Sequence, residues 1–505
     1  MSEFELYRKS FQGDLVLPGD PDYFQAIERW AVNSVRKARI VAFVKTDDDI
    51  TLSIRYARNA NLSLAIRGGG HSNVGASSAE DGLVIDLSRY FRRVSVDAHS
   101  KLAFVEGGAV WKDVDEAVIE HGLAVVGGTV NHTGVAGLTL GGGWGWLQGT
   151  HGLTVDNLHQ VTLILADGSR VVANDTENTE LFWALRGGGC NFGVCTEFVF
   201  RLRPQRRTLY AGVLLYPFTV LEDVVDVLNR WSRDVKQNEA AMVNFIKEED
   251  MEVPMIAVVV VYNGSETEGR SNFRALLDLS EYLDIVPQDS AEQVIHNGCT
   301  LEPVEDTTSE IAFEKLNEML NSRRVIMPGL SRFMRGFFNP ECRLDVEKLR
   351  HYFEVLTELP CQERRLNINL FVEYVNPTKV QEVPDDAMAL ARHSLNNSVA
   401  MVAWSVDTPE NTVLGRKAMW EVLNIFAPEK VWQPARLDTD ATNESKFQFD
   451  EDQDHRMANR RSGKELYGEE KYRKLQKLKR KYDPDLLFNK WFTIEPEPND
   501  NTNRA

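Results

Sequence analysis

The stretch Arg67-Gly68-Gly69-Gly70-His71-Ser72 constrains this chain most, because a bare glycine turn follows the strand-like apolar run Leu62 to Ile66. Glycine lets backbone N–H groups approach a diphosphate without interference from a Cβ atom. The histidine beside the turn can then meet whatever the diphosphate carries. The motif predicts a bound dinucleotide with the His71 imidazole at its reactive end.

Two further glycine clusters lie in the same half of the chain, at Gly134 to Gly145 and at Arg186 to Val194. A single glycine triplet beside a histidine is more often a tight corner than a ligand site. Three clusters in one region indicate three places where the backbone comes close to another group. Together they favour a cofactor site.

Hydrophobic periodicity predicts an α+β fold. Ile40 to Val44 and Leu62 to Ile66 have the pattern of buried strands on either side of a helix, which gives a β-α-β unit ending at the glycine turn. After Pro204 the glycine density falls, and strand patterns recur at Leu209 to Leu215, Met251 to Tyr262 and Leu366 to Val375. Amphipathic segments lie between these strands. We therefore expect a second domain in which helices back an antiparallel sheet.

Charge and composition exclude several classes of partner. The formal net charge is −18 at pH 7, so nucleic acid would be repelled. The N-terminus carries acidic residues where a signal peptide needs basic ones, and no apolar run reaches the length of a membrane span. The 5 cysteines are odd in number and scattered, which is typical of reduced thiols. We expect a soluble cytoplasmic protein with no metal, membrane or nucleic-acid partner.

Four motifs together resemble the FAD-linked oxidases of the berberine-bridge-enzyme type, in the vanillyl-alcohol-oxidase superfamily: Arg67 to Ser72, Gly134 to Gly145, Gly152 to Asn157 and Asn191 to Val194. The resemblance implies a PCMH-type FAD-binding domain. The residues then expected to contact FAD are His71, Arg67, Gly68, Gly69, Gly70, Ser72, Thr133, Gly134, Gly137, Gly141, Gly142, Asn157 and Val194.

The resemblance also suggests domain boundaries, and 505 residues exceed one ordinary core. We expect an FAD-binding domain at residues 36–204 and a substrate domain at residues 205–460. Residues 461–494 would return to the first domain, with a helix at Glu465 to Lys481 whose basic residues form a solvated face. Residues 495–505 are polar and predicted to be disordered.

In the family that the chain resembles, the histidine of the glycine motif is bonded to the 8α-methyl group of FAD. His71 occupies that position, and the alternative is a hydrogen-bonding neighbour of a non-covalent flavin. Many relatives carry a second tether, a cysteine, where this chain has Val130. A single covalent link is therefore expected. His132 is either a replacement ligand or, as we favour, a structural or diphosphate-adjacent residue.

The small side chain of Thr133 stands at the position that controls oxygen access in this family, which favours an oxidase. Alternation in Leu366 to Val375 places Glu373 on a mixed polar face, where some relatives have a carboxylate base. A solvent-facing strand edge would give the same pattern. Relatives with a tyrosine base carry it in a window that here reads Asp452 to Arg456. His455 in this window is an alternative base, or part of a charged loop.

These observations predict an FAD-dependent oxidase of specialised metabolism. It would take hydride from a small organic substrate, by alcohol oxidation or oxidative ring closure, and pass electrons to O₂. The alternatives are a dehydrogenase of a sugar or alcohol, a non-redox cyclase or isomerase that retains flavin, and a binding protein without flavin. Three glycine clusters beside His71 argue against the last of these.

Overall fold

The N-terminal region forms the predicted β-α-β unit, in which two parallel strands lead to the glycine turn. The computed structural model describes residues 1–247, 254–280, 307–321, 326–337, 343–358, 366–392, 397–428 and 463–498. Helix α3 (Asp47–Asn59) begins at a capping box, in which the Thr46 hydroxyl accepts from the Asp49 N–H and the Asp49 carboxylate accepts from the Thr46 N–H. The first sheet has the order β1 (Asp14–Val16), β2 (Ile40–Phe43), β4 (Leu83–Asp86), β3 (Leu64–Arg67).

A second, antiparallel sheet of five strands completes this region. Its order is β5 (Val94–Asp97), β6 (Leu102–Glu106), β10 (Val194–Arg201), β8 (Leu158–Ile164), β9 (Arg170–Asn174). The core around it is filled from helices α4 (Trp111–Ile119), α5 (Val135–Leu140) and α7 (Thr179–Gly188). Short elements connect these parts: α6 (Gln148–His151), η2 (Thr154–Asn157) and the pair β7 (Leu123–Ala124) and β11 (Arg203–Pro204).

The first 35 residues, which the predicted boundary leaves outside the FAD-binding domain, also pack on this region. Strand β1 pairs with β2, and Tyr7 from α1 (Glu3–Ser10) stacks on Tyr56 of α3 with ring centroids 4.6 Å apart. After α2 (Tyr23–Ile27) and η1 (Val32–Ser34), the backbone of Ala31 bridges to Leu330 in the second half of the chain. The segment therefore links both halves.

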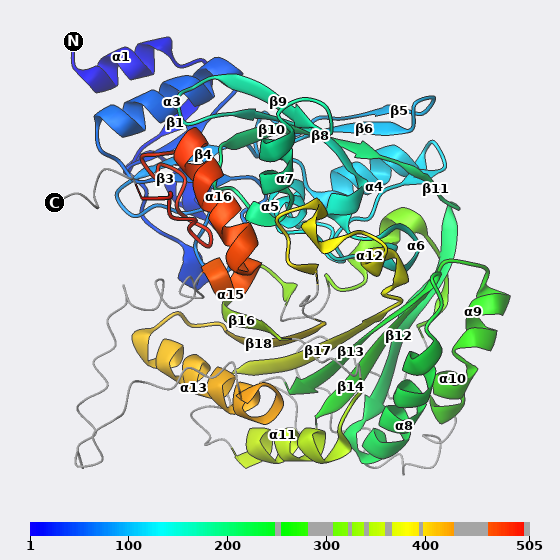
Figure 1. The fold of residues 1–505 in the computed structure, drawn as a ribbon. Coiled ribbons are helices and arrows are strands. Elements are labelled where there is room, and N and C mark those ends of the chain that lie inside the picture. The colour runs from blue at the N-terminus through cyan, green and yellow to red at the C-terminus, as the bar shows by residue number, and fades with distance from the viewer. Residues whose placement is uncertain are drawn as a thin grey trace.

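The second half of the chain forms a seven-stranded antiparallel sheet, as predicted. Its order is β15 (Ser309–Ala312), β12 (Thr208–Pro217), β14 (Met255–Tyr262), β13 (Glu239–Lys247), β17 (Asn367–Val375), β18 (Ser398–Trp404), β16 (Ser331–Phe337). Helices α8 (Leu221–Trp231), α10 (Arg274–Ser280), α11 (Val346–Glu358) and α13 (Pro409–Phe426) cover one face (Figure 1). The other described elements here are η3 (Phe218–Val220), η4 (Ser232–Asp234), α9 (Glu266–Asn272), η7 (Phe313–Glu318), α12 (Thr378–Gln381) and η10 (Asp385–Ala387).

The opposite face of this sheet packs on the N-terminal region. Met242, Phe371 and Met401 from the sheet share one apolar cluster with Trp30 and Trp146 from the first half. The predicted alternation in β17 is confirmed, because Ile368, Leu370, Val372 and Tyr374 lie in the cluster on the helix-covered face. Glu373 therefore belongs to the face that meets the N-terminal region.

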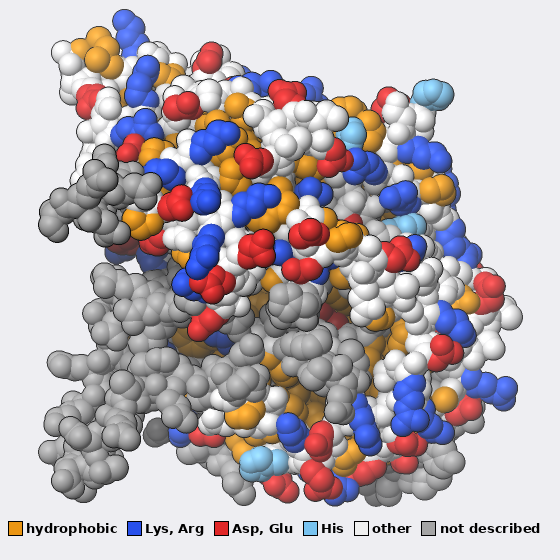
Figure 2. All heavy atoms as spheres, in the orientation of Figure 1, with side chains coloured by type: hydrophobic (Ala, Val, Ile, Leu, Met, Phe, Trp, Pro, Cys, Tyr) orange, Lys and Arg blue, Asp and Glu red, His pale blue; other side chains and the backbone are white. Residues whose placement is uncertain are grey.

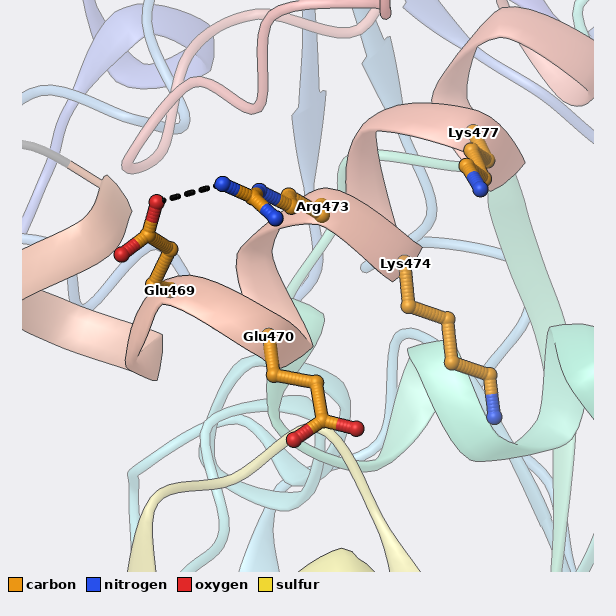
Figure 3. Close-up of a pocket in the computed structure, with 5 residues that line it drawn as sticks. All are labelled: Glu469, Glu470, Arg473, Lys474 and Lys477. Carbon is orange, nitrogen blue, oxygen red and sulfur yellow. Dashed lines mark hydrogen bonds and ion pairs between the residues drawn. The ribbon is translucent and has the colours of Figure 1, made fainter.

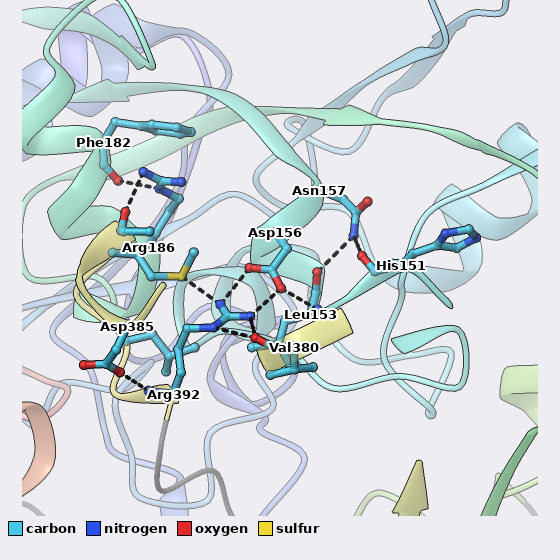
Figure 4. Close-up of polar contacts among 12 residues, drawn as sticks. His151, Leu153, Asp156, Asn157, Phe182, Arg186, Val380, Asp385 and Arg392 are labelled. Carbon is cyan, nitrogen blue, oxygen red and sulfur yellow. Dashed lines mark hydrogen bonds and ion pairs between the residues drawn. The ribbon is translucent and has the colours of Figure 1, made fainter. Parts of the chain in front are cut away.

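A buried ion pair joins the two halves of the chain near α12. Arg392 donates to both carboxylate oxygens of Asp156, at 2.7 and 2.8 Å, and also to the Val380 carbonyl (Figure 4). Asp156 in turn accepts from the Leu153 N–H. Both side chains are almost fully buried. Sequence patterns do not predict this contact, because its partners lie 236 residues apart.

The C-terminal segment returns to the N-terminal region and fills its core. Gly468, with φ +78°, divides the predicted helix into α15 (Gly463–Tyr467) and α16 (Glu469–Tyr482). The basic face is not wholly solvated, because the fully buried Lys479 donates to Asp483 and to the carbonyls of Asn191 and Phe488, each at 2.6 Å.

The start of the predicted disordered tail is ordered. The Glu497 N–H donates to the Gln476 carbonyl, and the Arg480 guanidinium donates to the Glu497 carbonyl. These contacts hold the chain against α16 as far as Pro498. The remainder of the predicted tail, residues 499–505, lies outside the described residues.

Charges of both signs share the surface. Figure 2 shows Lys and Arg side chains interspersed with Asp and Glu over the described part of one face. Within the described ranges, no helix has the length and apolar character that crossing a membrane requires. The cytoplasmic location stays a prediction.

The buried Lys479 provides a test of how the C-terminal segment is held. Lys479→Met leaves the carboxylate of Asp483 buried without its cation, which should cost about 3–5 kcal/mol of unfolding free energy. Urea denaturation followed by tryptophan fluorescence measures this cost. The matched control is Lys477→Met on the exposed side of the same helix, and equal stability of the two variants would contradict the role.

Candidate FAD and substrate site

Two of the predicted glycine clusters meet backbone to backbone. A Cβ atom on Gly69 would lie 2.5 Å from both the Cα and N atoms of Gly134, and one on Gly134 would lie 2.5 Å from the Gly69 N atom. A Cβ on Gly68 would lie 2.9 Å from the Gly107 carbonyl oxygen. Only glycine allows this approach at these positions. The turn after β3 and the start of α5 are thus held together.

The third cluster packs against protein rather than open space. A Cβ on Gly189 would lie 1.9 Å from the Trp491 ring, and one on Gly187 would lie 2.4 Å from the Leu390 N atom. Gly142 also faces Leu390, at 2.9 Å, and Gly141 faces Trp491, at 3.9 Å. Gly142 and Gly187 therefore make room for Leu390, and Gly189 makes room for Trp491, two residues that lie late in the sequence.

Among the other residues predicted to contact FAD, Gly137 has open space around it, and several others already bond or pack within the chain. Gly137 is exposed, with no atom within 4 Å of an added Cβ. The Ser72 hydroxyl accepts from the Ala76 N–H, and the Asn157 amide donates to the carbonyls of His151 and Leu153. The Thr133 carbonyl accepts from the Trp111 N–H. Gly70 has a φ of +69°, and Val194 is buried at the start of β10.

Two guanidinium groups lie beside the glycine turn. Arg67 donates to the buried Asp86 carboxylate and to the Ala26 carbonyl, each at 3.0 Å. Arg29 is 6% exposed and donates to the Ser77 carbonyl. Burial and the neighbouring Arg67 lower the pKa of Arg29 to about 9. The Asp86 carboxylate thus faces two guanidinium groups, those of Arg29 and Arg67. The excess positive charge suits a diphosphate. Arg29 lies outside the motifs found in the sequence.

His71 is clamped between an indole and a second imidazole. Its ring stacks on Trp30 with centroids 4.3 Å apart and planes at 14°, and its Nε2 lies 2.8 Å from Nδ1 of His132. The Arg332 guanidinium covers the Trp30 ring at 3.6 Å. Burial, His132 and Arg332 together lower the pKa of His71 to about 3. The imidazole is therefore neutral at physiological pH.

Glu373 lies on an interior strand. Because β17 pairs with both β13 and β18, the alternative of a solvent-facing strand edge is wrong. The carboxylate forms no hydrogen bond or ion pair with any residue that the structure describes, and burial raises the pKa of Glu373 to about 8. The alternative base, His455, lies outside the described residues.

A pair of amides shares this face with Glu373. Asn244 donates to the Asn369 side-chain oxygen at 2.8 Å, and both residues are almost fully buried. The Asn244 oxygen and the Asn369 nitrogen have no hydrogen-bond partner. Exchanging oxygen and nitrogen in both amides leaves the same result, one unused donor and one unused acceptor. The face therefore presents polar groups that carry no charge.

A surface hollow on α16 lies away from these groups. It is lined by Glu469, Glu470, Arg473, Lys474 and Lys477, which all stand on one helix (Figure 3). Arg473 pairs with Glu469 at 2.7 Å. The hollow reflects the spacing of long side chains on an exposed helix face and belongs to no cluster described above.

Comparison with known proteins identifies the class. Residues 38–174 match the FAD binding domain family. The chain is 28% identical over 515 residues to the FAD-linked oxidoreductase pgmH of Aspergillus terreus, covering 98% of this chain and 96% of that one. It is 25% identical to the (R)-6-hydroxynicotine oxidase of Paenarthrobacter nicotinovorans, covering 97% and 98%. The Physcomitrella patens BBE-like 1 structure superposes with a TM-score of 0.75 at 18% identity, covering 99% and 100%.

The matched domain and the full-length relatives support an FAD-linked oxidoreductase, and its fold is that of the BBE-like structure, with a PCMH-type FAD-binding region and a second region built on an antiparallel sheet. The chain carries an FAD-binding domain at residues 38–174, and it is similar over nearly its whole length to FAD-linked oxidoreductases. The resemblance drawn from the glycine motifs and the predicted fold class are therefore confirmed. The residues present also fit FAD, with close-packed glycine turns, excess positive charge and a neutral imidazole side by side.

The contact between the two glycine turns can be tested by adding one methyl group. Gly69→Ala must push the turn away from Gly134, so we expect a lower melting temperature and less bound FAD. Gly137→Ala, in open space on α5, should leave the melting temperature unchanged or slightly higher. Thermal unfolding compares the two variants, and flavin absorbance per protein measures the loss of FAD in Gly69→Ala. Equal melting temperatures of the two variants would show that the close approach of Gly69 to Gly134 is not needed.

Proposed function

We propose that the protein is an FAD-dependent oxidase that takes hydride from a small, uncharged organic substrate and passes the electrons to O₂. The observation that carries this proposal is the unpaired carboxyl of Glu373 on the sheet face that packs against the His71 side of the molecule. FAD, when bound, supplies the hydride acceptor. The chain supplies the base, the substrate surface and the cradle for the cofactor.

The choice of oxidase over dehydrogenase rests on two observations. A full-length relative, the (R)-6-hydroxynicotine oxidase, is named as an oxidase. Thr133, the residue that we assign to oxygen access, has a small side chain and lies next to His132 and Gly134. Both favour O₂ as the electron acceptor, with H₂O₂ as the product. The role in specialised metabolism is proposed by analogy.

The substrate is proposed from the chemistry of the sheet face. The unused acceptor on Asn244 and the unused donor on Asn369 together match one hydroxyl group, which donates to the first and accepts from the second. Met242, Phe371 and Met401 provide an apolar surround on the same face. An alcohol or phenol on an apolar skeleton fits this surface. A substrate carrying a charge would find no counter-ion in the amide pair.

Glu373 is suited to act as the base once it is ionised. Its carboxylate withdraws the substrate proton as hydride leaves the carbon, and burial places its pKa near the working range of an enzyme. His455 remains the alternative base in this proposal. The unpaired state of Glu373 favours it, because no hydrogen bond has to be broken before proton transfer.

Removing the carboxylate tests this assignment. Glu373→Gln should lower kcat by roughly 100- to 10,000-fold. In the wild type, kcat/KM should rise tenfold per pH unit and level off above about pH 8, because only the ionised carboxyl accepts a proton. Peroxide release with a panel of alcohols and phenols measures both. Glu197→Gln, another half-buried carboxyl, is the matched control. An unchanged pH profile in Glu373→Gln would exclude this base.

A single covalent bond between His71 and the flavin methyl group is part of the proposal. His71→Ala should move the yellow colour from the acid-precipitated protein to the supernatant, because no second tether is available at Val130. Absorbance spectra of pellet and supernatant measure the distribution. The exposed His99→Ala should leave the colour in the pellet. Colour that stays with His71→Ala would place the attachment elsewhere.

A further inference from the structure

We propose that His132 is a positioning residue for His71, which keeps the imidazole proton of His71 on Nε2 and so leaves the lone pair on Nδ1 as the nucleophile. The inference rests on the covalent link proposed above. It extends that link by assigning a role to a residue from a second loop, 61 positions further along the chain.

The geometry fixes which nitrogen of His71 is engaged. Nε2 lies 2.8 Å from Nδ1 of His132, so it is already hydrogen-bonded within the protein. Turning the ring over by 180° keeps its stack on Trp30 but puts a carbon, Cε1, in place of Nε2, so the hydrogen bond to His132 is lost. Trp30 is itself held, because its backbone N–H donates to the Gly70 carbonyl and its indole N–H donates to the Ile326 carbonyl. Nδ1 is therefore the nitrogen left to react.

Charge supports the same arrangement. Burial lowers the pKa of both histidines, and the Arg332 cation lowers them further, so the two rings are neutral together. A neutral pair has one donor and one acceptor between its facing nitrogens. Either direction satisfies this bond, and we assign the acceptor role to His132, which puts the proton of His71 on Nε2. Forming the link then removes one proton from the imidazole and one from the methyl carbon, and dioxygen takes both with two electrons to give H₂O₂.

The side chain of His132 is not needed to hold its own loop. The Trp111 N–H donates to the Thr133 carbonyl at 3.1 Å, and the Lys112 N–H donates to the Asn131 carbonyl at 2.8 Å. The Asn131 side chain also accepts from Asn321. The loop is thus anchored on both sides of His132 by other groups. A variant of His132 should fold, which separates positioning from stability.

The test compares two replacements of His132. Asparagine places its side-chain oxygen near the position of Nδ1 and still accepts a hydrogen bond, whereas leucine does not. FAD is added to full-length protein from riboflavin-starved cells, and the acid-stable flavin is measured over time. We expect His132→Leu to form the link about tenfold more slowly than the wild type, and His132→Asn to remain within about threefold. Total bound flavin and the melting temperature should change little.

The possible outcomes distinguish failure of the positioning role of His132 from failure of the covalent link at His71. If His132→Leu forms the link as fast as the wild type, the positioning role is wrong while the tether stands. If both variants lose the link equally, acceptance of the hydrogen bond is not what matters, and the role is again wrong. If the wild type itself forms no acid-stable flavin, the tether fails, and this inference fails with it. His99→Leu, at an exposed site, controls for the substitution itself.

Discussion

The approach of two glycine backbones is the contact on which the site depends. Gly69 and Gly134 lie so close that neither tolerates a side chain, and this contact brings the loops bearing His71 and His132 within hydrogen-bond distance. The steric freedom of glycine at two positions, far apart in sequence, thus sets the position of the His71 imidazole. The stack of Arg332, Trp30 and His71 extends the same contact into the second half of the chain.

The two faces of the seven-stranded sheet differ in composition and in what packs against them. One face is apolar and packs on helices, so it supplies the stability of the second half. The other carries the amide pair of Asn244 and Asn369 together with Glu373, in an otherwise apolar interface with the N-terminal region. Polar groups without partners are costly in such a place. Their presence is most simply understood if a ligand satisfies them.

The sequence predicted those parts of the fold that local periodicity encodes. The β-α-β unit and the two faces of β17 followed from apolar spacing. Strands β13 and β18 gave no such signal, because they are buried on both faces and their apolar runs do not alternate. Because the neighbouring strand β18 was not recognised, the sequence could not exclude that Glu373 lies on a solvent-facing strand edge. Arg29 and Trp30 were missed because they lie outside every motif and meet the glycine turn and His71, respectively, only through tertiary packing.

The arrangement of the C-terminal segment has a consequence for biosynthesis. Tyr467, Leu475, Leu478 and Ile494 complete the core that Phe182 and Leu185 begin, although the entire seven-stranded sheet is translated between these two groups. The core of the N-terminal region therefore cannot close on the ribosome until the C-terminal segment has been synthesised, after the entire sheet. All strands of the seven-stranded sheet are thus available for pairing before the core around α5 and α7 can be completed.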